Sequence, residues 1–352
     1  MNRSHIPGFH GRQTELERLR GLFDRVSGGS PGAVSGGPRM AILVAESGLG
    51  KTRLIQALYQ QLSRDPVWDP PDRNYWPDQF QAHDEQLRVN PLMKDHRSGG
   101  PPRFLWLGMR WPQPDARNET ERRCPLTELR SALDAHVETA LAQSGRWKSL
   151  VAKASTIARS DGPGDAAELG ADLLLPFGGL LVRAAQIARE LVRDQAGLGR
   201  NATERLEAAE EDVAEDLLGS LRLLFQGRVR LPTVVWLDDA QWIDERTLRF
   251  LHRLWDEAVR RSWPLLVVVT HWEREWALLA AREDRESTLA RYDDASIPDA
   301  AVIRLGPAEE RDLGDYLDAM FAGLTPAQRS LLLVKASGNF LSMVENVGYL
   351  RR

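Results

Sequence analysis

The sequence has a single cysteine, Cys124, among 352 residues. One cysteine cannot form an internal disulfide, so the sequence indicates a reducing compartment and a cytoplasmic protein. The histidines show no metal-ligand spacing such as His-x-x-x-His, and no zinc site is expected. The formal net charge of -4 is small, so it provides no general attraction to nucleic acid or to an acidic membrane surface.

Long apolar runs are also scarce. Residues 1–11 contain no apolar core of the kind that a signal peptide needs. The most apolar stretch, 169–192, carries charged side chains and is interrupted by Pro-Phe-Gly-Gly. A membrane span needs about 20 mostly apolar residues with few charges. We therefore expect no membrane span, and we interpret this stretch as a hairpin of buried helices rather than a membrane-touching element.

Apolar runs alternate with helical patterns along the chain. Short buried runs predict strands at 40–44, 104–109, 233–237, 265–269 and 301–305. Apolar residues at helical spacing predict helices at 11–23, 54–62, 126–142, 147–158, 204–225, 245–259 and over most of 308–350. Strands that alternate with helices indicate an α/β fold with a parallel five-stranded sheet and helices on both faces.

The pattern divides the chain into a core at 1–306 and a small helical lid at 307–352. Two insertions, 65–102 and 147–201, interrupt the core, and the sheet is expected to need neither. The second contains the apolar hairpin, which packs on its own core or provides a surface for self-association or a partner. The tryptophans are expected to be packing residues rather than a base-stacking platform; those in question are Trp76, Trp106, Trp111, Trp242 and Trp255.

The segment 45–52, Ala-Glu-Ser-Gly-Leu-Gly-Lys-Thr, fits the P-loop pattern except that Ala45 replaces the first glycine. Its glycines allow backbone N–H groups to turn toward phosphate oxygens, and the helix that follows points its positive end at the same anion. Lys51 adds a cation for the β- and γ-phosphates, and the Thr52 hydroxyl can bind Mg2+. The alternative is an ordinary glycine-rich turn. The candidate nucleotide-binding residues are Ser47, Gly48, Leu49, Gly50, Lys51, Thr52 and Arg53.

A second motif, Val-Val-Trp-Leu-Asp-Asp at 234–239, is an apolar strand that ends in two carboxylates. Asp238 is expected to hold Mg2+ through its water shell. Asp239 is expected to lie nearer the γ-phosphate and to orient or deprotonate the attacking water. A solvated turn remains the alternative for such a pair in isolation. Together with the P-loop, it predicts that Mg-ATP binds between Lys51, Thr52 and the two aspartates.

Four further segments carry a resemblance to a family. The opening segment 8–16, with Gly-Phe-His-Gly-Arg-Gln, resembles the start of many STAND ATPases (signal transduction ATPases with numerous domains) and of related AAA+ proteins. The run Asp-Asp-Ala-Gln-Trp-Ile-Asp at 238–244 is similar to the extended acidic motif of bacterial members. Segment 303–307 resembles their strand leading into the lid, and Ser-Gly-Asn at 337–339 resembles the Gly-Asn-Pro signature of that lid.

The resemblance implies further roles. Phe9, Gly11 and Arg12 would line the adenine and ribose side of the nucleotide. Thr270 would sense the γ-phosphate and belong to the catalytic set with Lys51 and Asp239. The sequence departs from the family where Trp272 replaces a common arginine and where Phe340 replaces the lid proline that contacts the base.

The function expected from these motifs is ATP binding with slow hydrolysis, used as a conformational switch. ATP or ADP and Mg2+ are the expected ligands. Partners are expected to be further copies of the chain, or a separate effector or sensor chain or domain. Two alternatives stay open: a nucleic-acid-loading ATPase similar to origin-recognition proteins, and a non-hydrolysing nucleotide-bound scaffold. The small net charge and the lack of a recognisable winged helix argue against a nucleic-acid partner.

Overall fold

The computed structural model is centred on five parallel strands in the order β2-β3-β4-β1-β5. It describes residues 9–29, 34–68, 88–91, 102–111, 129–133, 213–222, 230–293, 300–321 and 323–350, with positions 76, 126, 135, 136 and 225. The strands are β1 (Arg39–Val44), β2 (Leu105–Arg110), β3 (Thr233–Asp238), β4 (Leu265–His271) and β5 (Ala300–Arg304). The predicted parallel five-stranded α/β fold is therefore confirmed.

The strands form because their apolar runs are buried on both faces of the sheet. Every residue of β3 and β4 is buried, as parallel sheets covered by helices require. Three strands extend past their predicted ends, so that Arg110 closes β2, Asp238 closes β3, and Thr270 and His271 close β4. Because all strands are parallel, their carboxyl-terminal ends lie along the same side of the sheet, and these polar residues lie close together there.

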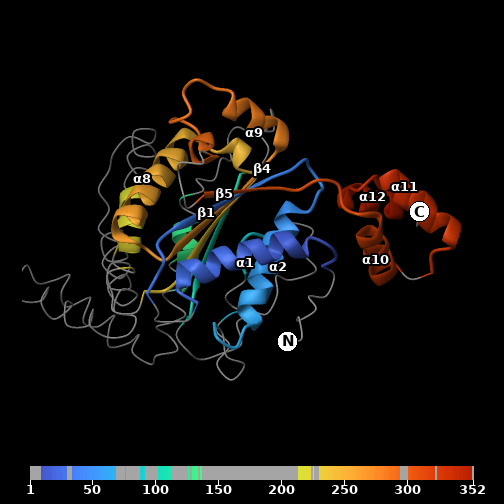
Figure 1. Ribbon diagram of the computed structural model, residues 1–352, viewed down its shortest axis with the longest axis horizontal. Coiled ribbons are helices and arrows are strands. Elements are labelled where there is room, and N and C mark those ends of the chain that lie inside the picture. The colour runs from blue at the N-terminus through green and yellow to red at the C-terminus, as the bar shows by residue number, and fades with distance from the viewer. Residues whose placement is uncertain are drawn as a thin grey trace, which may run out of the picture.

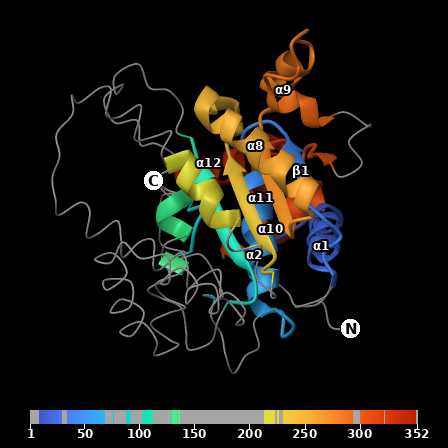
Figure 2. The same cartoon turned by 90° about the vertical axis from the view of Figure 1, so that its left-hand side faces the viewer.

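Helices cover both faces of the sheet (Figures 1 and 2). Helices α1 (Gln13–Ser27) and α2 (Lys51–Arg64) pack on one face with Leu43 and Trp236, whereas α8 (Glu245–Arg261) packs on the other. Helix α8 begins where the Asp244 carboxylate accepts a hydrogen bond from Thr247 N, and it ends two residues past the predicted position. Helix α1 begins and ends later than the predicted 11–23 because its apolar face continues to Val26.

Some elements were not predicted. They are the short helix η4 (Ala240–Trp242), α9 (Glu273–Ala280) and η5 (Leu289–Asp293). Helix α9 was missed because only Trp276 of its eight residues is buried, which leaves no apolar stripe in the sequence. The described positions within 126–136 and 213–225 are helical, in agreement with the predicted helices there.

Part of the first insertion belongs to the core, which corrects the expectation that the sheet needs neither insertion. Trp68, Trp76 and Val89 are buried with α1 and α2. Asn90 covers the outer edge of β2, where its side chain accepts from Gly108 N at 2.6 Å and donates to Gly108 O at 2.8 Å. These bonds satisfy backbone groups on the outer side of β2, where no described strand pairs with it; its other side pairs with β3. The predicted helix 147–158 and the apolar hairpin 169–192 lie outside the described residues.

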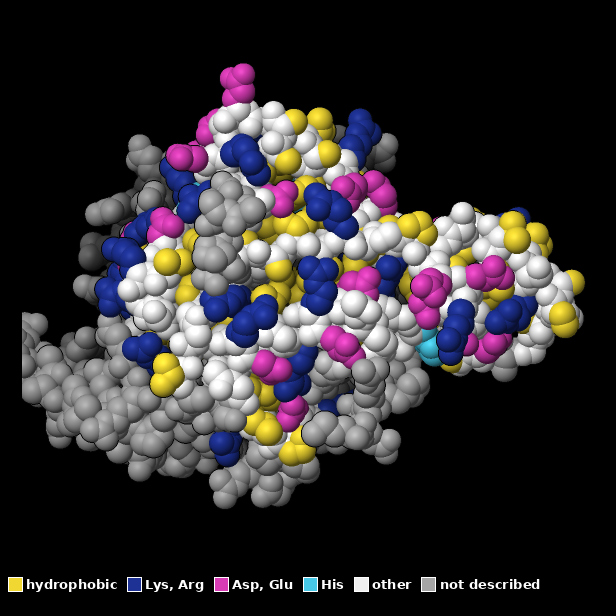
Figure 3. Space-filling view, in the orientation of Figure 1, with side chains coloured by type: hydrophobic (Ala, Val, Ile, Leu, Met, Phe, Trp, Pro, Cys, Tyr) yellow, Lys and Arg dark blue, Asp and Glu magenta, His cyan; other side chains and the backbone are white. Residues whose placement is uncertain are grey.

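The lid follows β5 as three helices with a small core of their own. They are α10 (Glu310–Met320), α11 (Pro326–Ala336) and α12 (Phe340–Leu350). Helix α11 starts at a capping box between Thr325 and Gln328, with Pro326 in its first turn. The lid forms a separate lobe beside the core, as the space-filling view shows (Figure 3).

Four of the five tryptophans expected to pack are buried, namely Trp76, Trp106, Trp111 and Trp255. Trp242 is half-buried at the candidate site. None of the described helices combines the length and apolar character needed to cross a bilayer.

Candidate functional site

The P-loop connects the end of β1 to the start of α2. Gly48 and Gly50 have positive φ angles of 80° and 91°, which explains why glycine stands at both positions. Ala45 is not among the residues with positive φ, so the missing first glycine causes no strain. Helix α2 begins at Lys51 without a side-chain cap or an acidic residue in its first turn. Its N–H groups and positive end therefore face the loop, as anion binding requires.

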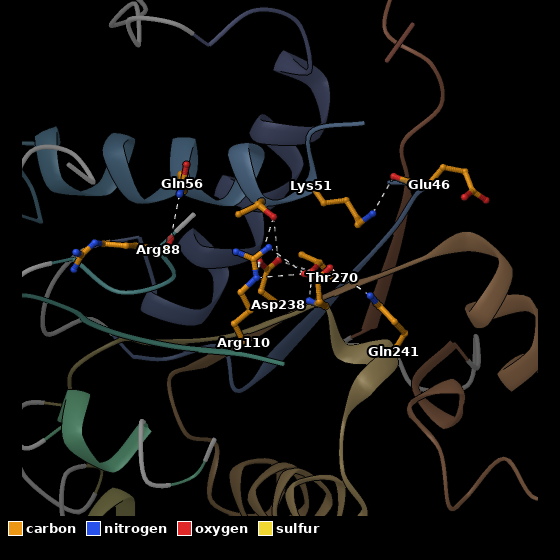
Figure 4. A network of polar contacts seen from close by, with 10 residues as sticks. Glu46, Lys51, Gln56, Arg88, Arg110, Asp238, Gln241 and Thr270 are labelled. Carbon is orange, nitrogen blue, oxygen red and sulfur yellow. Dashed lines mark hydrogen bonds and ion pairs between the residues drawn. The ribbon is translucent and has the colours of Figure 1, made fainter. Parts of the chain in front are cut away.

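Lys51 lies in the centre of the site (Figure 4). Its Nζ donates to Ala45 O at 2.7 Å and to Glu46 O at 3.0 Å, both in the P-loop itself. Burial lowers the pKa of Lys51, and the carboxylates of Asp239 and Asp238 act in the opposite direction. The ammonium group is thus held by neutral carbonyl oxygens inside the loop, next to two acidic groups.

Thr52 and Asp238 face each other across the end of the sheet. The Thr52 hydroxyl lies 3.3 Å and 3.2 Å from the two Asp238 carboxylate oxygens. Asp238 is fully buried, and burial, with the charge of Asp239, raises the pKa of this carboxyl to about 6. A buried carboxylate beside a hydroxyl is a donor set that suits Mg2+, because the ion prefers hard oxygen ligands and would compensate the charge. The predicted metal ligands therefore fit the ion.

Thr270 at the end of β4 connects the two aspartates. Its hydroxyl donates to Asp238 Oδ1 at 2.7 Å and accepts from Asp239 N at 2.9 Å. The single hydroxyl proton is therefore committed to Asp238. In this arrangement Thr270 orients both acidic residues, while its contact with a γ-phosphate stays a prediction.

Asp239 follows β3 in a left-handed backbone conformation with φ 56°. This turn directs its carboxylate toward Arg110, which the sequence analysis did not identify. Arg110 Nη2 lies 3.2 Å from Asp239 Oδ2, and Arg110 Nε lies 3.5 Å from Asp238 Oδ2. The strand register pairs Arg110 with Asp238, so the two side chains end at the same sheet edge. A strand prediction one residue longer than 104–109 would have placed an arginine there.

Two tryptophans and a glutamine close the site on the side of α9. One end of the Gln241 carboxamide lies 3.4 Å from Asp239 Oδ1. With oxygen at that end, Gln241 accepts from Trp242 Nε1 at 3.3 Å and from Trp272 Nε1 at 3.1 Å. Trp272 therefore supplies a neutral N–H donor to the carboxamide that lies beside Asp239.

The predicted adenine-side residues lie where core and lid meet. Arg12 donates to Gly306 O in the segment that leads into the lid, and it pairs with Glu15. Gly11 has φ 70° and packs against Asp312 of α10 so closely that a Cβ would overlap its carboxylate. Phe9 is buried in the core.

The remaining P-loop candidates divide between core and surface. Leu49 is buried, and the exposed Ser47 contacts the lid through its carbonyl oxygen. Burial lowers the pKa of Arg53, and Tyr316 of α10 acts against this shift. Arg53 therefore lies between the P-loop helix and the lid. The contacts of these residues with a base or ribose stay predictions.

The family model described as AAA ATPase domain matches residues 8–268, about three quarters of the chain. The chain belongs to the AAA ATPase domain family. The match includes the P-loop, the Asp238–Asp239 pair and Arg110, so all of these lie within the conserved domain of that family. No curated protein matches the chain.

Solved structures with similar folds include Cdc6p from Pyrobaculum aerophilum, with a TM-score of 0.45 and 12% sequence identity over 98% of this chain. Another is the Aeropyrum pernix ORC2 protein, solved in ADPNP-ADP complexes, with a TM-score of 0.40 and 14% identity over 99% of this chain. The chain spans 62% and 64% of the lengths of these two proteins.

Proposed function

We propose that this AAA ATPase domain binds Mg-ATP and hydrolyses it slowly, and that the bound nucleotide controls the position of the lid. The observation that carries the proposal is the convergence of four side chains at one sheet edge. Lys51, Thr52, Asp238 and Thr270 come from three separate elements, yet hydrogen bonds connect the last three directly. Phosphate chemistry requires this set of a cation, a metal-binding hydroxyl and a buried carboxylate.

The side chains divide the chemistry between them. Lys51 and the N–H groups at the start of α2 bind the phosphates. Thr52 and Asp238 hold Mg2+, which neutralises charge on the β- and γ-phosphates. Asp239 accepts the proton of the attacking water while the water oxygen bonds to the γ-phosphorus and the bond to the ADP oxygen breaks. Thr270 keeps both carboxylates in place.

Slow hydrolysis follows from the contacts of Asp239. Its carboxylate is engaged by the Arg110 guanidinium at 3.2 Å, so an attacking water must displace this ion pair before it can bond to the carboxylate. Basal turnover is therefore held down until the ion pair opens. Such a site suits a switch of the STAND type, in which nucleotide state controls self-association or contact with a separate effector or sensor.

Single-turnover measurement of γ-phosphate release from ATP, with and without Mg2+, tests the proposal. Slow, Mg2+-dependent release is expected. Binding without release over hours identifies a nucleotide-bound scaffold instead. The nucleic-acid-loading alternative predicts duplex DNA binding that weakens as salt rises, which a mobility-shift titration at two salt concentrations measures.

A further inference from the structure

The lid touches the P-loop directly, through the first residues of α12. Asn339 Nδ2 donates to Ser47 O at 2.8 Å, and the N–H groups of Phe340 and Leu341 approach Gly48 O at 3.2 Å and 3.4 Å. Gly48 packs so closely on the lid that a Cβ there would overlap the Asn339 carboxamide. The contact thus depends on the backbone of the P-loop and on one lid side chain.

These hydrogen bonds are made to the C=O groups of two peptide units whose N–H groups would bind phosphate. In a trans peptide the C=O of one residue and the N–H of the next lie in one plane and point in opposite directions. Fixing Ser47 O therefore orients the Gly48 N–H, and fixing Gly48 O orients the Leu49 N–H. Within the described residues neither N–H donates to a protein acceptor. Both remain available to an anion inside the loop.

Asn339 is well suited to this contact because both ends of its carboxamide are used. Its Oδ1 accepts from Ser342 N at 3.0 Å, which caps the start of α12, while Nδ2 is directed at Ser47 O. Asn339 N also donates to Ala336 O at 2.8 Å, which joins α12 to the end of α11. The orientation of the donor to the P-loop is thus fixed by the fold of the lid.

We propose that Asn339 is a positioning residue that holds the peptide groups of Ser47 and Gly48 in their phosphate-binding orientation. Helix α12 contains no lysine or arginine, so none of its side chains is a cation that could contact a phosphate. Helix α12 instead senses the nucleotide through the carbonyl groups of the P-loop. By reciprocity, a lid contact that favours nucleotide binding is itself favoured by the bound nucleotide to the same extent. This inference rests on the proposed function, since it concerns the same nucleotide site.

The test compares Asn339→Ser with Asn346→Ser in the full chain. Serine retains the helix cap through its hydroxyl oxygen, but its shorter side chain no longer carries an N–H group toward Ser47 O. Asn346 lies on α12, and among the described residues its side chain donates to Ser342 Oγ and not to the P-loop, so its variant controls for the substitution itself. Affinity for a fluorescent ATP analogue is measured by anisotropy. Lid position is measured by energy transfer between dyes on cysteines that replace the exposed Arg18 and Lys335, in a Cys124→Ser background.

Asn339→Ser is expected to weaken analogue affinity about fivefold, as loss of one neutral hydrogen bond predicts, and to abolish the nucleotide-dependent change in energy transfer. Asn346→Ser should change neither. If Asn339→Ser does not fold, Asn339→Thr replaces it, because threonine also caps a helix, lacks the carboxamide N–H and adds no charge beside the phosphate site. Wild-type affinity together with a wild-type energy-transfer response in the Asn339 variant overturns the inference and leaves Asn339 as a helix cap. Absence of analogue binding in the unmodified protein contradicts the proposed function instead.

Discussion

Arg110 at the end of β2 forms an ion pair with Asp239, with 3.2 Å between Nη2 and Oδ2. The proposed general base is therefore held by a cation from the neighbouring strand. Arg110→Ala should leave this carboxylate free to bind the attacking water and raise single-turnover hydrolysis by at least about threefold, because the ion pair no longer has to open before proton transfer. Phosphate release in the presence of Mg2+ measures the effect. Arg130→Ala, which removes a distant pair with Asp216, is the control. A fall in rate would show that Arg110 supports catalysis instead.

Lys51 is buried at the first position of α2, and its ammonium bonds only to carbonyl oxygens of its own loop among the described residues. Because it contributes charge rather than apolar packing, Lys51→Ala should reduce ATP-analogue affinity roughly a hundredfold and leave the fold intact. Calorimetry measures the affinity, and circular dichroism measures the fold. Unchanged affinity would reject the assignment of the P-loop.

Asp238 and Asp239 are adjacent in sequence but have different surroundings. Asp238 contacts Thr52 and Thr270 and is fully buried, whereas Asp239 turns toward Arg110. Asp238→Ala should therefore weaken the Mg2+ dependence of ATP-analogue binding. Asp239→Asn should retain binding and slow phosphate release about a hundredfold, the lower end of general-base effects. Titrations at two Mg2+ concentrations separate them, and equal loss of binding in both variants would show that the two roles are divided wrongly.

Local sequence patterns were sufficient to locate the P-loop segment and the acidic pair in the chain. The P-loop and the Asp238–Asp239 pair each follow a short apolar run, so strand, turn and functional residue are adjacent in the chain. The five strands were predicted to within two residues because burial on both faces demands continuous apolar runs. Strand order was not predicted, because it depends on which strands pair in space and not on the composition of any one strand.

Contacts between residues far apart in the sequence could not be predicted. Arg110 and Asp239 are 129 positions apart, and Asn339 and Ser47 are 292 apart. The sequence alone does not distinguish an arginine exposed to solvent from one that forms an ion pair at the site. The insertion 65–102 was misjudged for a similar reason, since Trp76 stacks on Phe104 and edge-on to Tyr59, and such packing leaves no periodic pattern in a proline-rich segment.

Stability should depend on pH through buried His136. Its Nε2 lies 3.1 Å from Trp106 O, and burial lowers its pKa from 6.5 to about 4. The unfolded chain then binds a proton that the folded chain does not, so stability falls as pH decreases from 6.5 toward 4. The contribution of His136 to the change between pH 7 and pH 5 should be a loss of about 2 kcal/mol. Urea unfolding at both values measures it. His136→Gln retains a donor without titrating, and an equal loss in that variant would assign the dependence to other groups.

Thr270 provides the last prediction, because its hydroxyl both donates to Asp238 and accepts from Asp239 N. Thr270→Val has nearly the same shape but removes both bonds. Misplacement of the two carboxylates should lower single-turnover hydrolysis about tenfold or more, whereas Thr270→Ser, which retains the hydroxyl, should keep most of the rate. The affinity of each variant for ADP separates orientation of the carboxylates from γ-phosphate contact, because ADP has no γ-phosphate. If Thr270→Val loses affinity for the ATP analogue but not for ADP, and hydrolyses the bound ATP at the normal rate, then Thr270 acts on the γ-phosphate. Its contacts with the two aspartates would then serve only to complete the buried hydrogen bonds.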